Sequence, residues 1–321
     1  MARTLRRILL ATGMALLPAA SIVAVAGVSS ASGVAAAPHG GSFPAHFAAP
    51  YLQIASSDAG DMAADMKASG NKFYTLAFLI PKGSCTAQWE DNNDPVGAFT
   101  SQINSLKSAG GNVIISFGGA SGGEPAEKCT SVSSLTAEYA KVVSTYGVTR
   151  LDFDVEGNDL NNTSANSRRD QALAALQKAN PSVQVDYTLP VAPAGLENNA
   201  LSLLKDAKSK GVKVSTVNIM TMDFGDGQNA LKDALSAANG THTQLGKIFT
   251  GSSSAQLWNM MGLTPIAGQN DDNEVFTQGN ASTLESFAKS NGVGVLAFWE
   301  VDGFDKTLGY AYTKVFTKIT G

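Results

Sequence analysis

The sequence alternates apolar and acidic side chains along Leu151-Asp152-Phe153-Asp154-Val155-Glu156-Gly157. Successive side chains of a β-strand point to opposite faces, so this stretch predicts one apolar face and one face with three carboxylates. A packed core does not take three carboxylates, because their desolvation and mutual repulsion cost too much free energy. We therefore expect a strand whose apolar face packs under helices and whose acidic face lines a chemically active interior. A solvated edge strand and a site for a hard cation such as Ca²⁺ or Mg²⁺ are the alternatives.

The surroundings of this strand predict the fold class. Short β-branched or aromatic runs alternate with amphipathic stretches, which is typical of βα units on a parallel sheet. Strands are expected to begin at Tyr51, Phe73, Val113, Arg150, Val183, Thr216, Leu263 and Val293. Helices between them are expected to stop at the C-cap glycines Gly70, Gly110, Gly147, Gly211 and Gly292. Eight strands and eight helices in about 270 residues predict an α/β fold, a single-domain (β/α)8 TIM barrel over 51–321, with an open doubly wound sheet as the alternative.

Composition narrows the class of function. Of the 321 residues, 44% are hydrophobic and 16% are charged, which excludes wholesale disorder. The 23 Lys and Arg against 27 Asp and Glu give a net charge of −4, and this balance argues against a nucleic-acid partner. The 3 histidines, His39, His46 and His242, nearly exclude chemistry that needs a histidine base or several imidazole metal ligands.

The N-terminal segment has the layout of an export signal. Three arginines precede an uncharged apolar run over 8–28, and small residues follow up to Ala37. Residues 1–37 are therefore expected to be a signal peptide and residues 38–50 a flexible lead-in. The mature protein is expected to be a secreted, extracellular monomer that meets a membrane only through its signal. A membrane anchor that stays attached is the alternative, because the apolar run nearly reaches the roughly 20 residues that span a bilayer.

The two cysteines of the chain, Cys85 and Cys129, are expected to form a disulfide. Export would place them in an oxidising compartment, where pairing is the default. They also follow the second and third predicted strands, which are neighbours in a barrel. Two free thiols are the alternative.

The acidic strand resembles a family motif. Its Leu-Asp-Phe-Asp-Val-Glu run resembles the D-x-x-D-x-D-x-E signature of family-18 glycoside hydrolases, the chitinases and their relatives. These enzymes carry the signature on the fourth strand of a (β/α)8 barrel. The resemblance puts Glu156 at the catalytic acid, Asp154 at its assisting aspartate and Asp152 at the supporting aspartate. Thr149 stands where the first aspartate of the signature is expected.

Other predicted strand ends resemble the same family. Ser116-Phe117-Gly118-Gly119 is similar to its S-x-G-G motif beside the site, and Trp299 matches its aromatic floor under the sugar. The run from Met220 to Phe224 is similar to the M-x-Y-D motif, with Asp223 as its aspartate. Substrate-binding positions are accordingly expected at Trp299, Asp223, Met220, Met222, Tyr187, Gln269, Asn270, Asp271, Gly118 and Gly119.

Met222 departs from the family pattern, because it replaces the tyrosine of M-x-Y-D. In relatives that hydroxyl helps to hold the N-acetyl oxygen of the sugar, and a thioether cannot donate such a hydrogen bond. Tyr187 on the fifth strand and Gln269 after the seventh are the candidates to supply it; otherwise activity is reduced.

The resemblance implies retaining, substrate-assisted hydrolysis of β-1,4 bonds between N-acetylglucosamine units. Glu156 would protonate the glycosidic oxygen while the substrate's own N-acetyl carbonyl attacks the anomeric carbon, and Asp154 would orient the acetamido group. Crowding by Asp154 should raise the pKa of Glu156 and keep it protonated. Chitin or another N-acetylglucosamine oligosaccharide is the expected partner, with no metal or organic cofactor. The short segment between strands seven and eight favours an open groove and endo-type cutting.

Three other functions fit parts of the sequence. A chitinase-like lectin would bind N-acetylglucosamine chains without cutting them, and Met222 favours it while Glu156 opposes it. An endo-β-N-acetylglucosaminidase that releases N-glycans would share the same acids. The segment Gly119-Ala120-Ser121-Gly122-Gly123 also fits the G-x-S-x-G elbow of serine hydrolases, which needs a downstream histidine, and His242 in a predicted polar loop is the sole candidate.

Overall fold

The computed structural model describes residues 40–55, 62–225, 227 and 230–320, and these belong to one compact unit. The predicted signal peptide and the first two residues of the predicted lead-in lie outside the described residues. Among the helices that are described, none is both long enough and apolar enough to cross a membrane.

In the described residues, eight main strands of the sheet run parallel, and each begins within about two residues of its predicted start. Neighbouring strands pair in the order β13, β10, β9, β7, β6, β5, β3, β2. Their bounds are β2 (Tyr51–Gln53), β3 (Phe73–Lys82), β5 (Asn112–Gly118), β6 (Arg150–Asp154), β7 (Gln184–Ala192), β9 (Val214–Met220), β10 (Met261–Thr264) and β13 (Val295–Leu296). Two short strands pair antiparallel with strands of this sheet, β4 (Thr86–Trp89) with β3 and β8 (Gly195–Leu196) with β7, while β11 (Gly268–Gln269) and β12 (Val275–Phe276) form a separate hairpin.

The sheet closes into a barrel through the segment before β2. Strand β1 (Phe47–Ala48) pairs in parallel with β13. The amides of Ala49 and Tyr51 then donate to the carbonyls of Leu296 and Phe298, at 2.9 and 3.0 Å, and so carry the pairing into β2. This closure confirms the predicted barrel and excludes the open doubly wound sheet, whose edges would remain unpaired.

The predicted flexible lead-in differs from the structure in its second half. The rings of Phe43 and Phe47 pack against Phe73, with centroids 4.9 and 5.6 Å away, and the Arg150 guanidinium lies 5.0 Å from the Phe47 centroid. Phe47 is buried. The segment is rich in Ala, Gly, Pro and Ser, and this composition predicts flexibility. It is ordered instead because the packing of Phe43 and Phe47 offsets the entropy lost when the backbone is fixed.

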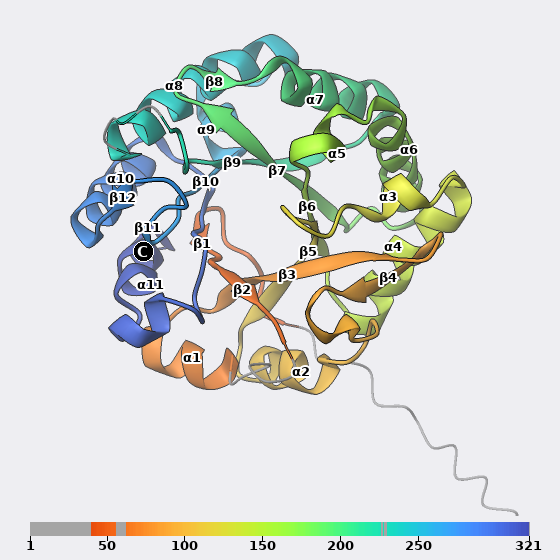
Figure 1. Ribbon diagram of the computed structural model, residues 1–321, viewed down its shortest axis with the longest axis horizontal. Coiled ribbons are helices and arrows are strands. Elements are labelled where there is room, and N and C mark those ends of the chain that lie inside the picture. The colour runs from red at the N-terminus through yellow and green to blue at the C-terminus, as the bar shows by residue number, and fades with distance from the viewer. Residues whose placement is uncertain (1–39, 56–61, 226, 228–229, 321) are drawn as a thin grey trace, which may run out of the picture. The chain divides into compact units, whose positions relative to one another are not determined.

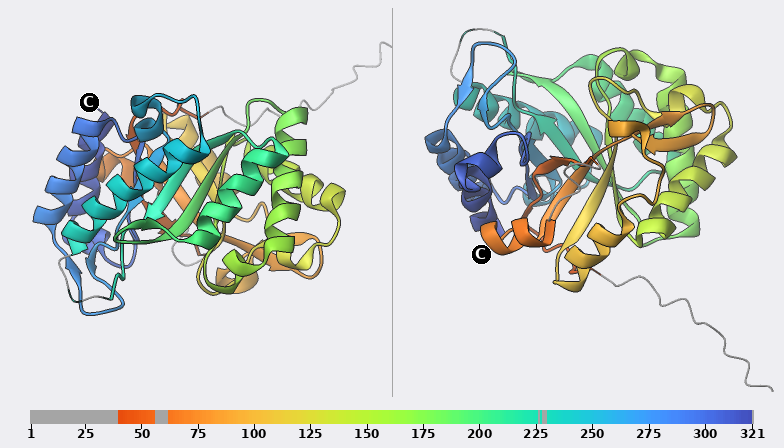
Figure 2. Two further views of the ribbon diagram at one scale, coloured as in Figure 1. Left: turned by 90° about the horizontal axis from the view of Figure 1, so that it is seen from above. Right: turned by 60° about the horizontal axis from the view of Figure 1, so that its bottom comes forward.

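Helices surround the barrel, as Figures 1 and 2 show. Each of the eight strands is followed by one of the main helices: α1 (Met62–Ser69), α2 (Thr100–Ser108), α4 (Val132–Tyr146), α6 (Thr163–Ala179), α7 (Asn198–Lys210), α8 (Ala230–Ile248), α10 (Gln278–Asn291) and α11 (Ala311–Phe316). Shorter helices are α3 (Pro125–Lys128), α5 (Gly157–Asn161) and α9 (Ser254–Asn259). Gly147, Gly211 and Gly292 end α4, α7 and α10 in the left-handed conformation, as the sequence predicted.

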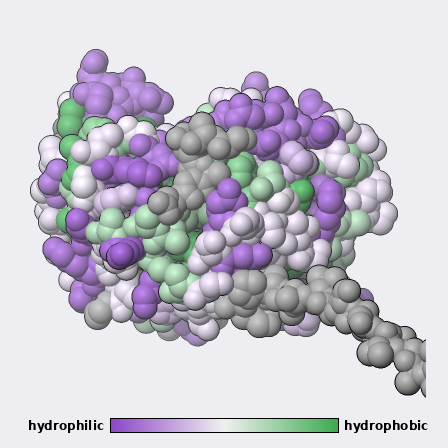
Figure 3. Space-filling view, turned by 90° about the horizontal axis from the view of Figure 1, so that it is seen from below, coloured by the Kyte–Doolittle hydropathy of each residue, from purple (hydrophilic) through white to green (hydrophobic). Residues whose placement is uncertain are grey.

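The apolar core lies between the sheet and the helices. Phe117 on β5 and Phe153 on β6 stack with centroids 5.2 Å apart, and Tyr139 of α4 meets both edge-on. This packing fixes the outward face of the acidic strand, so its other face must point into the barrel. Large hydrophobic side chains that are exposed among the described residues are Val275, Phe304 and Leu308. On the face shown in Figure 3, hydrophilic groups gather at the two upper corners.

Cys85 and Cys129 form a disulfide, as predicted, and it joins the turn after β3 to the end of α3. We expect the Cys85→Ser/Cys129→Ser variant to lose about 2–4 kcal/mol of unfolding free energy, because the bond closes a loop of 44 residues in the unfolded chain. Urea unfolding in oxidising buffer measures the loss. Reduced wild type should match the variant, and equal midpoints for oxidised wild type and variant would contradict the expectation.

Candidate active site

The carboxylates of β6 enter the barrel at the carboxyl ends of the strands. Leu151, Phe153 and Val155 are fully buried in the outer core, and Asp154 and Glu156 line a pocket. Asp152 lies one step deeper on the same face. The prediction that three acids share an inward face is thus confirmed. The complete pocket lining is Tyr51, Phe78, Ala120, Asp154, Glu156, Thr188, Met220, Met222, Asp223, Thr264, Ile266, Asp271 and Trp299.

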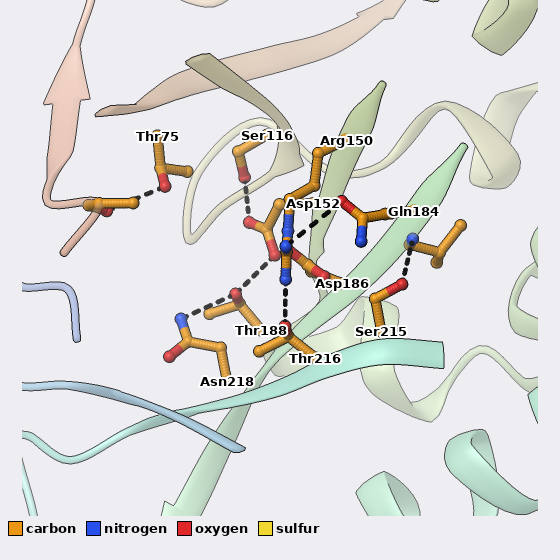
Figure 4. A network of polar contacts seen from close by, with 12 residues as sticks. Thr75, Ser116, Arg150, Asp152, Gln184, Asp186, Thr188, Ser215, Thr216 and Asn218 are labelled. Carbon is orange, nitrogen blue, oxygen red and sulfur yellow. Dashed lines mark hydrogen bonds and ion pairs between the residues drawn. The ribbon is translucent and has the colours of Figure 1, made fainter. Parts of the chain in front are cut away.

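Asp152 is held by hydroxyl groups from three strands, β5, β7 and β2, and Figure 4 shows those of Ser116 and Thr188. Ser116 Oγ donates to its Oδ2 at 2.6 Å, Thr188 Oγ1 donates to its Oδ1 at 2.7 Å, and the Tyr51 hydroxyl donates to Oδ2 at 3.1 Å. Burial raises the pKa of Asp152 to about 7, although the hydrogen bond from Ser116 opposes the shift. Asp152 is therefore a fixed group that can hold or release a proton beneath Asp154 near neutral pH.

A second buried polar pair lies below Asp152. Arg150 Nε donates to Asp186 Oδ2 at 2.5 Å, and Arg150 and Asp186 precede Asp152 and Thr188 by two residues on their strands (Figure 4). Asn218 Nδ2 donates to Thr188 Oγ1 at 3.1 Å from the next strand. Below the pocket, the barrel interior is thus a hydrogen-bonded network of polar side chains. This network supports Asp152, Asp154 and Glu156 from beneath.

Asp154 and Glu156 both have a pKa raised above its ordinary value. Burial is the largest cause that raises the pKa of Asp154, followed by the charges of Glu156 and Asp152. Within the described residues, Oδ1 of Asp154 is buried without a hydrogen-bond partner. Burial also raises the pKa of Glu156, and the charges that add to it belong to Asp159 and Asp223. The predicted direction for Glu156 is therefore right, whereas its predicted cause, crowding by Asp154, is not the one that dominates.

Two aromatic rings form a wall of the pocket. Trp299 and Phe78 stack with centroids 5.6 Å apart and planes 7° apart, and the Tyr51 ring lies 6.0 Å from Trp299. An exposed indole face of this kind suits the apolar face of a sugar ring. Trp299 therefore occupies the place that the sequence predicted for it.

Gly118 and Gly119 shape the site, and neither lines the pocket. A Cβ on Gly118 would lie 2.0 Å from the carbonyl oxygen of Asp154, and one on Gly119 would lie 2.6 Å from the Phe78 ring. The Gly119 amide donates to that same Asp154 oxygen at 3.1 Å. These glycines let the loop after β5 pass close to the acidic strand, and Ala120 then lines the pocket.

The loops after β9 and β10 supply the opposite wall. Met220, Met222, Asp223 and Asp271 line the pocket, as predicted. Asp223 Oδ1 accepts the amides of Asp271 and Asp272, at 2.8 and 3.3 Å, and this joins the two loops. Burial raises the pKa of Asp223.

Three predicted binding residues do not reach the pocket. Tyr187 pairs with Phe153 in register and points outward, where its hydroxyl donates to Asp170 at 2.6 Å. Gln269 turns back onto its own hairpin, and its Nε2 donates to the Asp272 carbonyl at 2.9 Å. The Asn270 side chain is buried without a hydrogen-bond partner in the described structure and does not line the pocket. The prediction used their place in the chain and overlooked the alternation of faces.

Three polar pocket residues, Tyr51, Thr188 and Thr264, were not predicted, although a sequence signal exists for Thr188. Thr188 pairs with Asp154 in register, so the alternation that excludes Tyr187 selects Thr188. Tyr51 opens the first strand, and nothing in its own sequence context marks it as a partner of Asp152.

The rival functional sites find no support in the geometry. His242 stacks on Trp258 at 4.2 Å and bonds to Ser254 on the outside of the barrel, away from the loop that carries Ser121. In the part of the chain that the structure describes, no group of three His, Cys, Asp or Glu is placed to hold a metal ion.

Comparisons with known proteins agree with this geometry. The model of glycosyl hydrolases family 18 matches residues 51–267. A probable bifunctional chitinase/lysozyme of Escherichia coli K12 is 33% identical over 81% of this chain, and endochitinase 11 of Metarhizium anisopliae is 33% identical over 81%. The aligned parts amount to 31% and 52% of those two relatives, so the chain spans about half of their length or less.

A solved structure is also similar along nearly its whole length. Catalytic-site mutants of active domain 2 of a thermostable chitinase from Pyrococcus furiosus, complexed with chito-oligosaccharides, superpose with a TM-score of 0.79 at 32% identity. The match covers 88% of this chain and 97% of that one.

Proposed function

The chain belongs to family 18 of the glycosyl hydrolases, and we propose that it hydrolyses β-1,4 bonds between N-acetylglucosamine units of chitin. One observation carries the proposal: Glu156, whose pKa is raised by burial, lines a pocket together with Asp154 and the Trp299 ring. The relatives named for chitinase activity and the complex with chito-oligosaccharides support the same substrate class.

In the proposed mechanism the protein supplies acid catalysis and positioning, and the substrate supplies the nucleophile. Glu156 gives its proton to the glycosidic oxygen while the N-acetyl carbonyl oxygen of the −1 sugar attacks C1, so the glycosidic bond breaks as the oxazolinium ring forms. Asp154 accepts the acetamido N–H and offsets the positive charge that develops there. Glu156 then takes a proton from the water that opens the ring, and the β configuration is retained.

Met222 leaves the N-acetyl group without the usual tyrosine hydroxyl. Tyr187 and Gln269 cannot replace it, since both side chains are engaged away from the pocket. Asp271 lines the same pocket, and its backbone is fixed by the aspartate that follows Met222. A carboxylate accepts hydrogen bonds and cannot donate one to the N-acetyl oxygen, so Asp271 does not replace the tyrosine hydroxyl. We therefore expect Met222 to leave that oxygen without this hydrogen bond and activity to be reduced.

An endo mode of attack is part of the proposal. The described segment between β10 and β13 consists of the small hairpin β11–β12 and then α10. A short connection of this kind leaves the groove beside Trp299 open, so a polymer can be bound along its length and cut internally.

Secretion is also proposed, on the basis of the predicted signal peptide over 1–37. A disulfide between Cys85 and Cys129 is typical of proteins that fold in an oxidising compartment. N-terminal sequencing of protein collected outside producing cells tests this part, and an intact N-terminus retained with the cells would overturn it.

The central experiment is hydrolysis of a soluble chitin tetramer by the mature protein, with products identified by mass and anomeric form. Release of shorter oligomers with the β configuration supports the proposal. A lectin is the second candidate, because of Met222, and it predicts oligomer binding without any turnover. An N-glycan substrate in parallel separates a chitinase from an endo-β-N-acetylglucosaminidase.

Trp299→Ala is expected to lower kcat/KM for the tetramer by about 10- to 100-fold, because the sugar loses an aromatic face against which it packs. Trp299→Phe should recover part of the loss. Trp258→Phe is the control, since Trp258 stacks on His242 away from the pocket. Unchanged kinetics in Trp299→Ala would remove Trp299 from the binding site.

A further inference from the structure

A second pair of carboxyl groups lies beside the site. Glu127 of α3 and Asp159 of α5 are hydrogen-bonded to each other through their side chains. Their oxygens converge on Gly123, where an added Cβ would lie 2.9 Å from Glu127 Oε2 and 3.4 Å from Asp159 Oδ2. Two carboxyl groups make such a contact only when one of them carries a proton.

Asp159 is tied to the acid of the proposed reaction through the backbone. Glu156 is the N-cap of α5, and the Asp159 amide donates to the Glu156 carbonyl at 3.1 Å. The Asp159 side chain contacts the loop after β5, where its Oδ2 accepts the Glu124 amide at 3.0 Å. One aspartate therefore holds the turn that carries Glu156 against the loop that follows β5.

The geometry points to Glu127 and Asp159 as positioning residues: we propose that their shared proton fastens the loop after β5 to the turn of Glu156, and that the charge of Asp159 favours protonated Glu156. This inference rests on the proposed function, in which Glu156 acts as an acid. Neither residue lines the pocket, so neither is a catalytic residue.

The electrostatics agree with that placement. The hydrogen bond to Asp159 is the largest cause that raises the pKa of Glu127 to about 7, and burial and the charge of Asp159 add to it. After burial, the charge of Asp159 is the largest cause that raises the pKa of Glu156. Below that pKa, Glu127 therefore carries a proton that it can donate to Asp159.

Other charged groups act on the pair or lie on the elements packed against it. Lys128, adjacent to Glu127, lowers the pKa of that group, as does a hydrogen bond with Asn162. The α7 end that meets α5 presents the neutral Asn199. The packed elements carry further charged groups: Glu124 at the N-cap of α3, Arg168, Arg169, Asp170 and Lys178 on α6, Lys205, Asp206, Lys208 and Lys210 on α7, and Lys82 on β3. Arg168 is bonded to the Ala126 carbonyl and Arg169 pairs with Glu124, and within the described residues no ion pair joins Asp159 to a cation.

The test compares pH profiles of kcat/KM for Asp159→Asn, Glu127→Gln, Glu127→Ala and wild type. Asp159→Asn should move the basic limb to lower pH by about half a unit or more, because Glu156 loses its proton more easily without that negative charge. Glu127→Gln keeps a hydrogen-bond donor for Asp159. It should leave kcat/KM near the wild-type value at about pH 5–6, which lies below the pKa of about 7 of Glu127. Glu127→Ala should lower it several-fold.

The matched control is Asp91→Asn, an exposed aspartate in the connection between β4 and α2. If the basic limb of Asp159→Asn coincides with those of wild type and Asp91→Asn, the inference is overturned. Equal activity of Glu127→Gln and Glu127→Ala would show that the shared proton does not position Glu156.

A second measurement separates this inference from the proposed function. Titration of the ¹³C-labelled Glu156 carboxyl by NMR needs no turnover, and it should show a lower pKa in Asp159→Asn than in wild type. An inactive wild type with this difference would reject the chitinase proposal and keep the charge coupling. An active wild type with the same Glu156 pKa as Asp159→Asn would support the chitinase proposal and reject the charge coupling.

Discussion

Replacing Glu156 by glutamine should lower kcat for the chitin tetramer by about 10³-fold while oligomer binding stays within about threefold. The amide has the shape of a protonated carboxyl and can donate a hydrogen bond, but it cannot give up a proton to the glycosidic oxygen. The loss should therefore appear in kcat rather than in affinity. Single-turnover kinetics and calorimetric titration of the tetramer measure the two quantities separately.

Glu197→Gln is the matched control for this variant, since Glu197 is an exposed glutamate at the start of α7 whose side chain caps nothing. It should retain wild-type kinetics. If Glu156→Gln still cleaves the tetramer at more than about a tenth of the wild-type rate, Glu156 is not the acid. If wild type and Glu156→Gln bind equally and neither cleaves, the protein is a lectin.

The pH dependence of wild-type activity should report the pKa of Glu156. Glu156 must be protonated to act, so activity falls as pH rises through its pKa, which burial places above the ordinary glutamate range. A basic limb in the range of an unperturbed glutamate, near pH 4.3, would mean that the pocket fills with water when substrate is absent.

The acidic strand could be predicted from the sequence because its signal is local. Two-residue alternation in β6 determines which side chains share a face, and the outer core of Leu151, Phe153 and Val155 leaves the acids no direction except inward. The same alternation in β7 turns Thr188 inward beside Asp154 and Tyr187 outward beside Phe153, which is why the predicted role of Tyr187 is wrong. The barrel itself followed from the repeated strand and helix pattern.

Other features depend on contacts between distant residues and have no local signal. The role of Tyr51 arises because barrel closure brings the first strand within 3.1 Å of Asp152, which is 101 positions away. The order of the segment around Phe47 depends on Arg150 and Phe73, which are contributed by β6 and β3. The charge of Asp159 acts on Glu156 only because the turn of α5 folds back on its own N-cap. Such features become visible once the strands are in register.

Behind the acidic strand, a buried charge cluster should account for the largest effect on stability. Arg169 of α6 is 1% exposed, lies 3.7 Å from Glu124 and donates to Asn166 at 2.6 Å. Burial raises the pKa of Glu124, which the arginine opposes, and raises the pKa of Asp170 to about 7. Arg169→Met keeps most of the volume and removes the cation from two fully buried acids. We expect it to lower the free energy of unfolding by about 3–5 kcal/mol at pH 8.

The loss should depend on pH in a defined direction. Without Arg169, the folded-state pKa values of Glu124 and Asp170 rise further above their unfolded values, so the folded state binds more protons and stability falls as pH rises. Urea unfolding should therefore show a smaller loss at pH 5 than at pH 8. Arg168→Met is the control, because Arg168 bonds only to a backbone carbonyl in the described structure and should cost about 1 kcal/mol at either pH. Equal losses for Arg169→Met at the two pH values, or a more stable variant, would show that Glu124 and Asp170 are already neutral in the wild-type fold. In that case hydrogen bonds from Tyr139 and Tyr187, rather than the arginine charge, would stabilise the cluster.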